Sequence, residues 1–450
     1  MTPLAALLLA YSIGLIALGV WMGRRVRASQ DFFVAGRTLS PALIFATFLA
    51  ANIGAGSTVG ATGYAYTDGM AAWWWNGSAG LGSLVLAFTV GPRIWREASR
   101  MNFMTAGDFL EHHFGRGVRG LAAGIIWLGS FAILCGQLRG AGEVLQTVAG
   151  WSMPTGALVS AAITGAYFVA GGLVSAATVN LIQLVIILTG FAIAAPMVAS
   201  AAGGVGTIGD ATFWRGEQVG WQTLLLLGPA FFLSPGLLQK AFGARDERAV
   251  TTGVAWNGVV LLGFSFLPVI LGLAARALHP GLERPEMALP TVLANDVPTI
   301  VGAFALAAVF SAELSTADAV LFMLATSGAR DFYRGFVRPQ ASDADVLRVA
   351  RILAIVGCAV GYLLTYVFDS VVSALTMFYS VLVVTLFAPI LGGLYLPKAG
   401  RFSALAAMLV GVTTLGATHL MTAGGGFGWA TPSFLGLIAS GLTYLILAVF

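Results

Sequence analysis

The most unusual chemistry in this sequence lies in one apolar stretch, where hydroxyl and carboxyl side chains follow each other closely. Residues 311–318 read Ser-Ala-Glu-Leu-Ser-Thr-Ala-Asp. With about 100° between successive residues of a helix, one face is shared by Ala312, Ser315, Thr316 and Ala319. Hydroxyl and backbone carbonyl oxygens are the ligands that hard cations prefer, so this face indicates a cation site. The alternative is that the hydroxyls bond to their own helix, and the residues alone leave both interpretations open.

Two carboxylates flank this hydroxyl face. Glu313 lies about 60° from Thr316 and Asp318 about 60° from Ser315, on opposite sides. A charge near the centre of a bilayer costs at least about 2.5–3.5 kcal/mol, so each carboxylate is a candidate for function. One of them could support a cation, carry a proton or pair with a cationic substrate. The structural alternative is a carboxyl group that is protonated or hydrogen-bonded inside a helix bundle.

Two apolar segments are interrupted near their middle. Residues 50–57 read Ala-Ala-Asn-Ile-Gly-Ala-Gly-Ser, and residues 233–236 read Leu-Ser-Pro-Gly, where the proline removes a backbone donor. Each break lies in the first span of a block of five, 41–200 or 219–396, and an odd number of spans gives the blocks opposite orientations. Interrupted helices at corresponding positions indicate an inverted-repeat transporter with its site at the midplane. Glycine and proline kinks without a site are the alternative.

The composition requires a membrane around these segments. Hydrophobic residues make up 58% of the 450 residues and charged residues only 9%, with a mean hydropathy of +0.89. Soluble domains carry about 25% charged residues. Long apolar runs favour helices over the ten-residue alternation of a membrane barrel. The sequence therefore predicts an all-α polytopic membrane protein with thirteen spans: 2–23, 41–66, 70–92, 119–148, 153–172, 176–200, 219–238, 249–275, 298–327, 349–368, 371–396, 402–421 and 431–450.

The positive charges are sorted by membrane side. With the N-terminus outside, nineteen of the 23 Lys and Arg residues fall in or beside the inner loops 24–40, 93–118, 173–175, 239–248, 328–348 and 397–401. The positive-inside rule makes this side cytoplasmic and places the C-terminus inside. The same sorting explains the basic pI without a nucleic-acid partner. Among the four remaining cations, Arg139 is expected to form an outer-edge ion pair with Glu143 at i+4.

One cytoplasmic loop has a helix-start pattern. In residues 105–115, Thr105 and Asp108 have capping-box spacing. The adjacent His112 and His113 raise the question of a metal, and an exposed amphipathic loop helix is the favoured interpretation.

Several ordered motifs resemble one family, the sodium:solute symporters, which include the sodium–glucose and sodium–proline transporters. The resemblance covers nearly the whole chain. It is carried by Asp-Phe-Phe-Val-Ala-Gly-Arg at 31–37, by 105–115, by Tyr-Phe-Val-Ala-Gly-Gly at 167–172 running on to Gln183, and by Ser315-Thr316 followed by Asp-Phe-Tyr at 331–333. The resemblance implies a LeuT-type fold built as a 5+5 inverted repeat, with the N-terminus outside.

The resemblance also implies a sodium site between the second and ninth spans. Carried over position by position, its ligands are the carbonyl groups of Ala50, Ile53 and Ala312 and the hydroxyl groups of Ser315 and Thr316. All five positions hold chemically suitable residues.

For the transported solute, the resemblance places candidates at Asn52, Ser57, Asn76 and Ser234. Sugar-transporting relatives carry larger polar groups or an aromatic lid nearby, whereas Gly236 stands where that lid would be. A hexose is therefore disfavoured, and an amino acid, a carboxylate or an amine stays open. The tryptophans at 73–75 could stack on a ring or cation, but lipid-facing packing at the membrane interface is favoured.

The chain departs from the family signature at one acidic position. Asn180 stands where relatives carry an aspartate that contributes to a second or relayed sodium position, and Val179 replaces the preceding threonine. One sodium ion per cycle is therefore expected rather than two. We hypothesise that the negative charge has moved from position 180 to Glu313 or Asp318.

These observations together predict sodium-coupled symport of a small organic solute by alternating access, in a bacterial inner membrane and with a monomer as the functional unit. The first alternative is a proton-coupled or cationic-substrate carrier that uses Glu313 or Asp318. A transporter-like sensor is a less favoured alternative. No enzyme is expected, since the spans lack a catalytic constellation. The expected organisation is an extra span and first loop at 1–40, the repeats 41–200 and 219–396 joined by an outer loop at 201–218, and two final spans at 397–450.

Overall fold

The computed structural model describes residues 10–14, 17, 21, 33–204, 206, 217–396 and 400–449. Most of the expected first span (2–23), the loop up to residue 32, most of the outer loop 201–218 and residues 397–399 lie outside this part of the chain. The described part is helical throughout and contains no strand, only two isolated bridges.

The first half of the chain forms one series of helices. In order, its elements are η1 (Ala35–Arg37), α3 (Pro41–Asn52), η2 (Gly56–Gly60), α4 (Ala61–Asp68), η3 (Gly69–Ala72), α5 (Trp73–Val85), η4 (Leu86–Val90), α6 (Gly91–Met101), α7 (Ala106–Phe114), α8 (Arg116–Ala149) and α9 (Met153–Ala201). The predicted capping box starts α7, because the Thr105 hydroxyl accepts from the backbone N–H of Asp108 at 3.0 Å and the Asp108 carboxylate accepts from that of Thr105. Residues of the expected fifth and sixth spans both belong to α9.

The second half forms another series. Its elements are α11 (Glu217–Leu233), α12 (Pro235–Phe242), α13 (Glu247–Phe264), α14 (Phe266–Leu278), η5 (Pro285–Met287), α15 (Ala288–Asn295), α16 (Thr299–Thr326), η6 (Ser327–Val337), α17 (Asp343–Leu364), α18 (Val371–Tyr395), α19 (Arg401–Met421) and α20 (Pro432–Val449). Among the described residues, eight helical segments are long and apolar enough to cross a membrane, or nine if a bent pair is one span.

Both predicted interruptions are present. Pro41–Asn52 and Gly56–Met101 meet at an angle of 62° across a short break. In the second half, Ser234 leaves the helical conformation (φ −55°, ψ 120°) between α11 and α12, where Pro235 cannot donate a backbone hydrogen bond. The two broken helices can therefore present backbone groups to the interior of the bundle.

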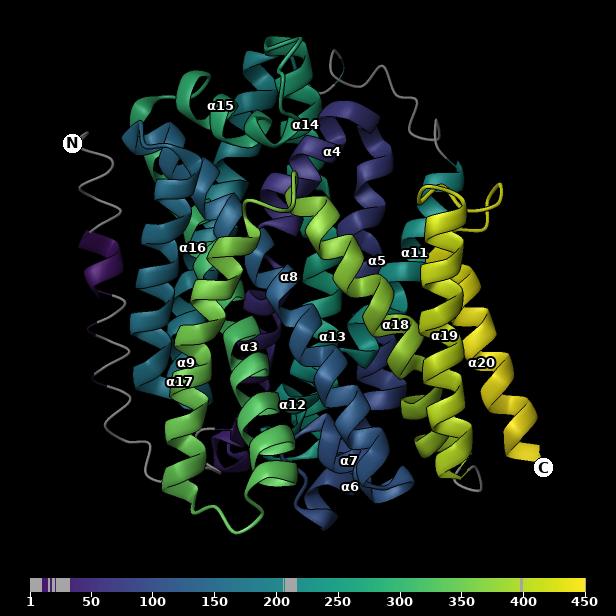
Figure 1. Cartoon of the computed structure of the whole chain (residues 1–450). Helices are drawn as coiled ribbons and strands as arrows, with labels where there is room; N and C mark the ends of the chain where they lie inside the picture. Colours follow the sequence, from purple (N-terminus) through teal and green to yellow (C-terminus); the bar gives the residue numbers. More distant parts are fainter. Residues whose placement is uncertain are drawn as a thin grey trace.

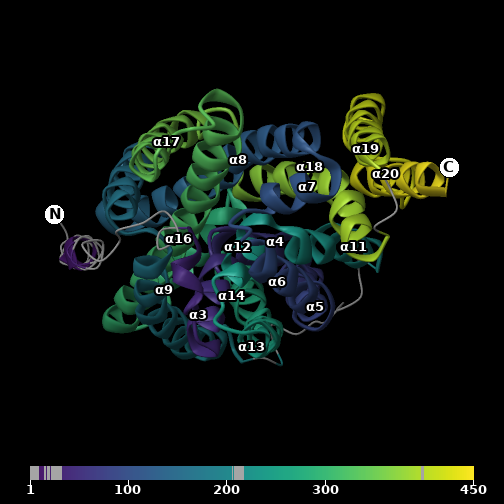
Figure 2. The same cartoon turned by 90° about the horizontal axis from the view of Figure 1, so that it is seen from below.

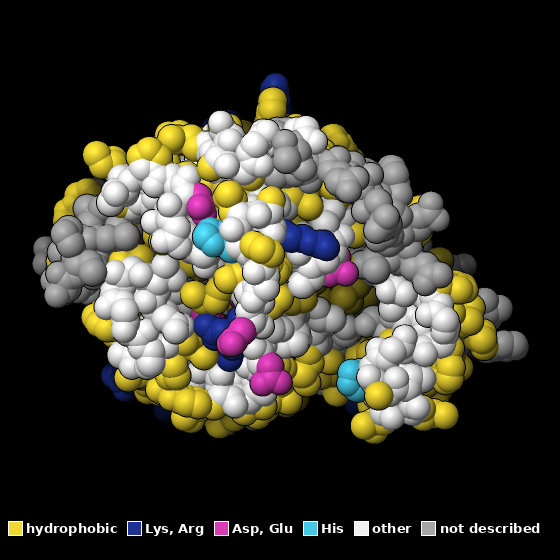
Figure 3. Space-filling model, turned by 90° about the horizontal axis from the view of Figure 1, so that it is seen from above, with side chains coloured by type: hydrophobic (Ala, Val, Ile, Leu, Met, Phe, Trp, Pro, Cys, Tyr) yellow, Lys and Arg dark blue, Asp and Glu magenta, His cyan; other side chains and the backbone are white. Residues whose placement is uncertain are grey.

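The helix α16 lies inside the bundle and packs against α8, α9 and α3. The pair α19 and α20 lies at one edge, and α20 ends toward the α6–α7 end of the molecule (Figures 1 and 2). Outward faces expose large hydrophobic side chains such as Leu128, Val185 and Ile355, as expected for contact with lipid. On the opposite, α14–α15 end, Figure 3 shows a few charged side chains scattered among hydrophobic ones.

Candidate functional site

The break in α3 meets α16 through carbonyl and hydroxyl oxygens. Oγ of Ser315 lies 3.1 Å from the carbonyl oxygen of Ala50 and 2.9 Å from that of Ala312. Oγ1 of Thr316 lies 3.0 Å from the carbonyl oxygen of Ala50 and 3.0 Å from that of Ile53. We name these five atoms the five-oxygen cluster. The structure brings together all five residues that were expected to supply cation ligands.

The break explains why these carbonyl groups are available. Helix α3 ends at Asn52, and Ile53 has an extended backbone (φ −100°, ψ 98°), so the regular ladder of helical hydrogen bonds stops there. Carbonyl groups at a helix end need partners from elsewhere. Ser315 does bond within its own helix, the alternative that the sequence left open, but Ser315 and Thr316 also reach across to α3. All five oxygens are neutral, which suits a cation of low charge.

Gly54 leaves room for the cluster inside the break. A Cβ atom at this position would overlap the Thr316 hydroxyl and lie 2.5 Å from Oε1 of Gln137. The same Gln137 oxygen, on α8, accepts a hydrogen bond of 2.8 Å from the backbone N–H of Ala55. A backbone donor released by the break is thus satisfied by a side chain from another helix.

Two adjoining cavities lie beside the cluster, with empty volumes of about 490 Å³ and about 320 Å³. All four candidate substrate residues line them: Asn52 lines both, Ser234 the larger, and Ser57 and Asn76 the smaller. Thr316 of the five-oxygen cluster also lines both cavities. A solute in either cavity would therefore be next to the cluster.

Hydrogen bonds fix the polar wall of the smaller cavity. Nδ2 of Asn76 donates to the carbonyl oxygen of Ser57 at 2.9 Å, and the Ser57 hydroxyl donates to that of Asn52 at 2.5 Å. Nδ2 of Asn52 then donates to Oδ1 of Asn257 on α13 at 3.1 Å. These bonds connect η2 to α5 and the end of α3 to α13.

Aromatic side chains form much of the remaining wall. Trp75 is buried and lines the smaller cavity, so the lipid-facing interpretation is wrong for this tryptophan. Gly236 lines the larger cavity but has no side chain that could cover it. Phe231 and Tyr379 line both cavities. The cavities thus combine aromatic faces with amide and hydroxyl groups.

The two carboxylates of α16 have different surroundings. Glu313 is fully buried, and its Oε1 accepts a hydrogen bond of 2.9 Å from the Thr58 hydroxyl on η2. Its Oε2 has no hydrogen-bond partner among the described residues. Asp318 is also buried and interacts electrostatically with Lys240 on α12. The two groups therefore face different helices.

Lys240 is the site residue that sequence reasoning missed. It was assigned to the inner loop 239–248, but it lies inside α12, almost fully buried, and its Nζ donates to the carbonyl oxygen of Thr47 at 2.9 Å. Lys240 also lines the larger cavity. A charged residue two positions after an apolar run gives little signal by itself, because such residues commonly end a span.

Asn180 is buried on α9, the helix that packs against α16. Neither polar atom of its amide has a hydrogen-bond partner among the described residues. The position at which the resemblance implied an aspartate is thus inside the protein.

The expected ion pair between Arg139 and Glu143 is wrong. Arg139 instead donates to the carbonyl oxygens of Thr365, Phe368 and Asp369 at 2.8–2.9 Å, after the end of α17. Glu143 accepts two hydrogen bonds, of 3.0 Å and 2.8 Å, from Arg284. Each residue thus has a partner that is distant in sequence. Arg139 binds the carbonyl groups that follow α17, and Glu143 binds Arg284.

Comparison with known proteins assigns this arrangement to a family. The model described as the sodium:solute symporter family matches residues 32–215 and 216–411, most of the chain. The chain belongs to the sodium:solute symporter family. This symporter is 25% identical over 428 residues to the high-affinity choline transporter 1 of Drosophila melanogaster, covering 88% of this chain and 67% of that protein. It is 25% identical over 443 residues to the sodium/pantothenate symporter of Escherichia coli (strain K12), covering 90% of this chain and 88% of that protein.

The symporter also shares its fold with a solved transporter. A Na⁺-coupled sialic acid symporter in a substrate-bound, outward-open state superposes with a TM-score of 0.85 at 15% identity, over 100% of this chain and 98% of that one. The likeness shows the LeuT-type fold that was expected. The symporter is thus a multi-pass cell-membrane transporter rather than an enzyme, it couples solute transport to sodium, and its solutes are small organic molecules.

Proposed function

We propose that sodium binds at the five-oxygen cluster and drives uptake of a solute held in the adjoining cavities. The observation that carries this proposal is the contact between the hydroxyl groups of Ser315 and Thr316 and the carbonyl groups of the α3 break. A sodium ion between these oxygens would replace the hydrogen bonds from the hydroxyl groups to the carbonyl oxygens, and each hydroxyl would keep its proton and turn it away from the ion. Because the ligands come from α3 and α16, sodium would draw the two helices together beside the solute.

We further propose one sodium ion per cycle. The neutral Asn180 supports this stoichiometry, because it removes the acidic group that a second ion would need. One charge moved through about 100 mV releases about 2.3 kcal/mol. A tenfold sodium gradient adds about 1.4 kcal/mol, so one ion supports roughly 500-fold accumulation of a neutral solute.

For the solute, we propose an amino acid or another small carboxylate, with an amine as the runner-up. The larger cavity offers one ammonium group, from Lys240, together with the side chains of Asn52 and Ser234. A hexose would need more directed hydrogen bonds than these groups provide. Relatives named for choline and pantothenate support the size class of the solute.

For the topology, we propose thirteen spans with the N-terminus outside and the C-terminus inside. The two five-span repeats would be 41–200 and 219–396, with 1–40, 201–218 and 397–450 outside them. The matched helix breaks support the repeats, and the sorting of the Lys and Arg residues supports a cytoplasmic position for the α6–α7 end. We take the monomer as the functional unit.

A thermal-shift screen tests the assignment of the solute and the ion together. Purified protein would be heated with amino acids, carboxylates and amines, either in sodium chloride or in sodium-free potassium chloride. We expect the midpoint of unfolding to rise with one solute class, and to rise further in sodium, because each ligand that binds only the folded state stabilises it. A solute effect that is identical with and without sodium would contradict coupling at this site.

Glu313 supports a second candidate function, proton coupling. The carboxyl group is fully buried, and only one of its oxygens has a hydrogen-bond partner among the described residues. A neutral, protonated carboxyl fits these surroundings, and its proton could be released in another conformation. The test is uptake of the identified solute into sodium-free vesicles with an inward proton gradient. Uptake that is lost in Glu313→Gln would favour protons, whereas no uptake in the wild type would favour sodium alone.

A further inference from the structure

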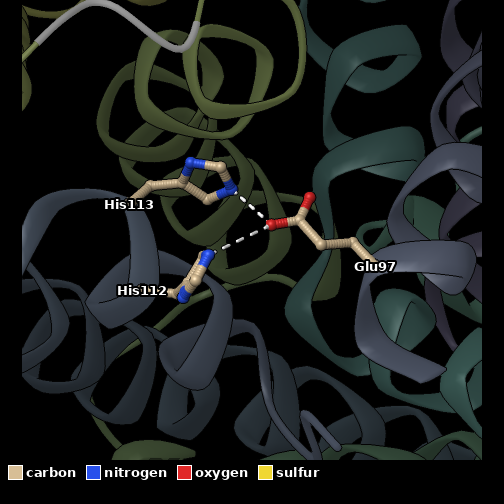
Figure 4. A group of neighbouring side chains, drawn as sticks. All are labelled: Glu97, His112 and His113. Atoms are coloured by element: carbon tan, nitrogen blue, oxygen red, sulfur yellow. Dashed lines mark hydrogen bonds and ion pairs between the residues drawn. The ribbon is translucent and has the colours of Figure 1, made fainter. Parts of the chain in front are cut away.

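A second group of possible metal ligands lies at the α6–α7 end of the molecule. Nε2 of His113 lies 2.6 Å from Oε1 of Glu97, and Nε2 of His112 lies 4.0 Å from the same oxygen. One ligand atom from each of the three residues lies within 4.8 Å of the other two. Figure 4 shows both rings directed toward the Glu97 carboxylate. We propose that Glu97, His112 and His113 form a binding site for a divalent transition-metal ion, with Zn²⁺ as the best fit.

The chemistry of the three residues favours a metal over a simple hydrogen bond. A hydrogen bond to Glu97 needs only one imidazole, yet His112 is directed to the same oxygen although its side chain is 41% exposed. Two imidazoles and one carboxylate are a ligand set that proteins use for zinc with one open position. Ligand distances of about 2.0–2.2 Å put neighbouring ligands of a tetrahedral zinc about 3.3 Å apart, so the observed 2.6 Å and 4.0 Å need to change by less than about 1 Å.

Neighbouring rings hold the two histidines in place. The His112 ring lies 5.4 Å from that of Phe103, and the His113 ring 4.5 Å from that of Phe109, measured between centroids. The two imidazoles are nearly perpendicular to each other, at 87°. Rings fixed in this way lose little freedom on binding a metal, and the exposed side of His112 gives an ion access.

The site would join two parts of the bundle. At the end of α6, the Arg37 guanidinium donates to the carbonyl oxygens of Ala98 and, on α12, Phe242, each at 3.0 Å. Helix α7 instead packs along α8, where Arg119 lies 3.2 Å from the Asp108 carboxylate. A bound ion would therefore tie α6 to α7 on the side that we propose is cytoplasmic. Residue spacing indicates this site only through the two histidines, because Glu97 lies 16 residues before His113.

Metal titration of the purified full-length protein tests the site without any transport assay. After treatment with a chelator, the protein would be titrated with Co²⁺, followed by its visible absorption, and with Zn²⁺ in competition. We expect one site per chain, with the intense visible bands of four-coordinate cobalt. In His112→Gln we expect affinity to fall at least about tenfold, because one of three ligands is lost. His112 makes the longest contact in the group, so this variant keeps the hydrogen bond between His113 and Glu97.

Two further variants separate this site from others. Glu97→Gln should weaken binding by a similar factor, whereas His279→Gln, at the opposite end of the bundle, should bind Co²⁺ as the wild type does. Zn²⁺ should raise the midpoint of thermal unfolding of the wild type but not of His112→Gln. Wild-type protein without saturable binding below about 100 μM would overturn the proposal. So would a His112→Gln variant that binds as tightly as the wild type.

Discussion

The hydroxyl of Thr316 lies 3.0 Å from the carbonyl oxygen of Ile53, although 263 residues separate them in the chain. This contact joins a continuous helix, α16, to the point where α3 is broken. Each partner depends on the other, because the break exposes the carbonyl and the helix supplies a hydroxyl for it. The affinity for a sodium ion placed between them would therefore depend on the relative position of the two helices.

The space at Gly54 gives the first prediction. In Gly54→Ala, the added methyl group would overlap the Thr316 hydroxyl and crowd Gln137. We expect sodium affinity to fall at least about tenfold, a loss of about 1.4 kcal/mol, measured by binding of radioactive sodium to purified protein. Gly124→Ala is the matched control, because a Cβ at Gly124 meets no atom within 4 Å. Equal loss in both variants would show that the effect is not specific to the cluster.

The buried cation of α12 gives the second prediction. Lys240→Met keeps the length of the side chain but leaves Asp318 without this nearby positive charge. Removing one partner of a buried charge pair costs about 3–5 kcal/mol, and we expect a loss in this range in the free energy of unfolding by SDS titration. The double variant Lys240→Met/Asp318→Asn should recover at least half of it. If the double variant is less stable than Lys240→Met alone, the two charges do not act as a pair.

Glu286, which lies outside the spans, gives a prediction about pH. Its Oε1 accepts a 2.5 Å hydrogen bond from the backbone N–H of Val371 at the start of α18. Burial raises the pKa of Glu286 above its usual 4.5, and the Val371 hydrogen bond opposes the rise. A raised pKa means that the folded protein holds the proton more tightly. This contribution to stability is complete below pH 4.5 and is lost as pH rises through the raised pKa.

In Glu286→Gln this titration is absent, while an oxygen that accepts from Val371 is kept. We therefore expect the unfolding midpoint of the variant, relative to the wild type, to increase as pH rises above 4.5 and to level off once pH passes the raised pKa of Glu286. Thermal unfolding in detergent over this range measures it. Glu283→Gln, at an exposed position in the same loop, serves as the control. A midpoint difference that stays constant or decreases with pH would be inconsistent with a buried carboxyl at position 286.

The sequence predicted the helical class, the two interruptions and the five residues of the cluster. The helical class and the interruptions depend on local properties: apolar runs long enough to span a bilayer, and glycine, serine and proline at the breaks. The set of five cluster residues is instead what the resemblance to the sodium:solute symporters implied. The predicted hydroxyl face on α16 is also local, because it needs only the helical period. The structure then adds that Ser315 and Thr316 contact α3 as well as their own helix.

The errors have a common physical cause. Arg139 bonds to carbonyl groups that follow α17, and Glu143 pairs with Arg284, so both partners depend on how distant helices pack. Lys240 was assigned to a loop because a lysine usually ends a span. It is buried in α12 instead, where the Thr47 carbonyl oxygen accepts its hydrogen bond and Asp318 supplies a nearby negative charge. Partners that are far apart in the chain are not visible in residue spacing.

The most direct test of the account is equilibrium binding of radioactive sodium to the purified protein. We expect one saturable sodium ion per chain in the wild type. The double variant Ser315→Ala/Thr316→Ala should lose affinity at least about tenfold, because it removes both hydroxyl ligands and leaves the carbonyl groups. Thr326→Ala is the matched control, since among the described residues this buried threonine on the same helix bonds only to the Phe322 carbonyl oxygen of its own helix, at 2.7 Å. Sodium binding that is unchanged in the double variant would contradict the proposed site.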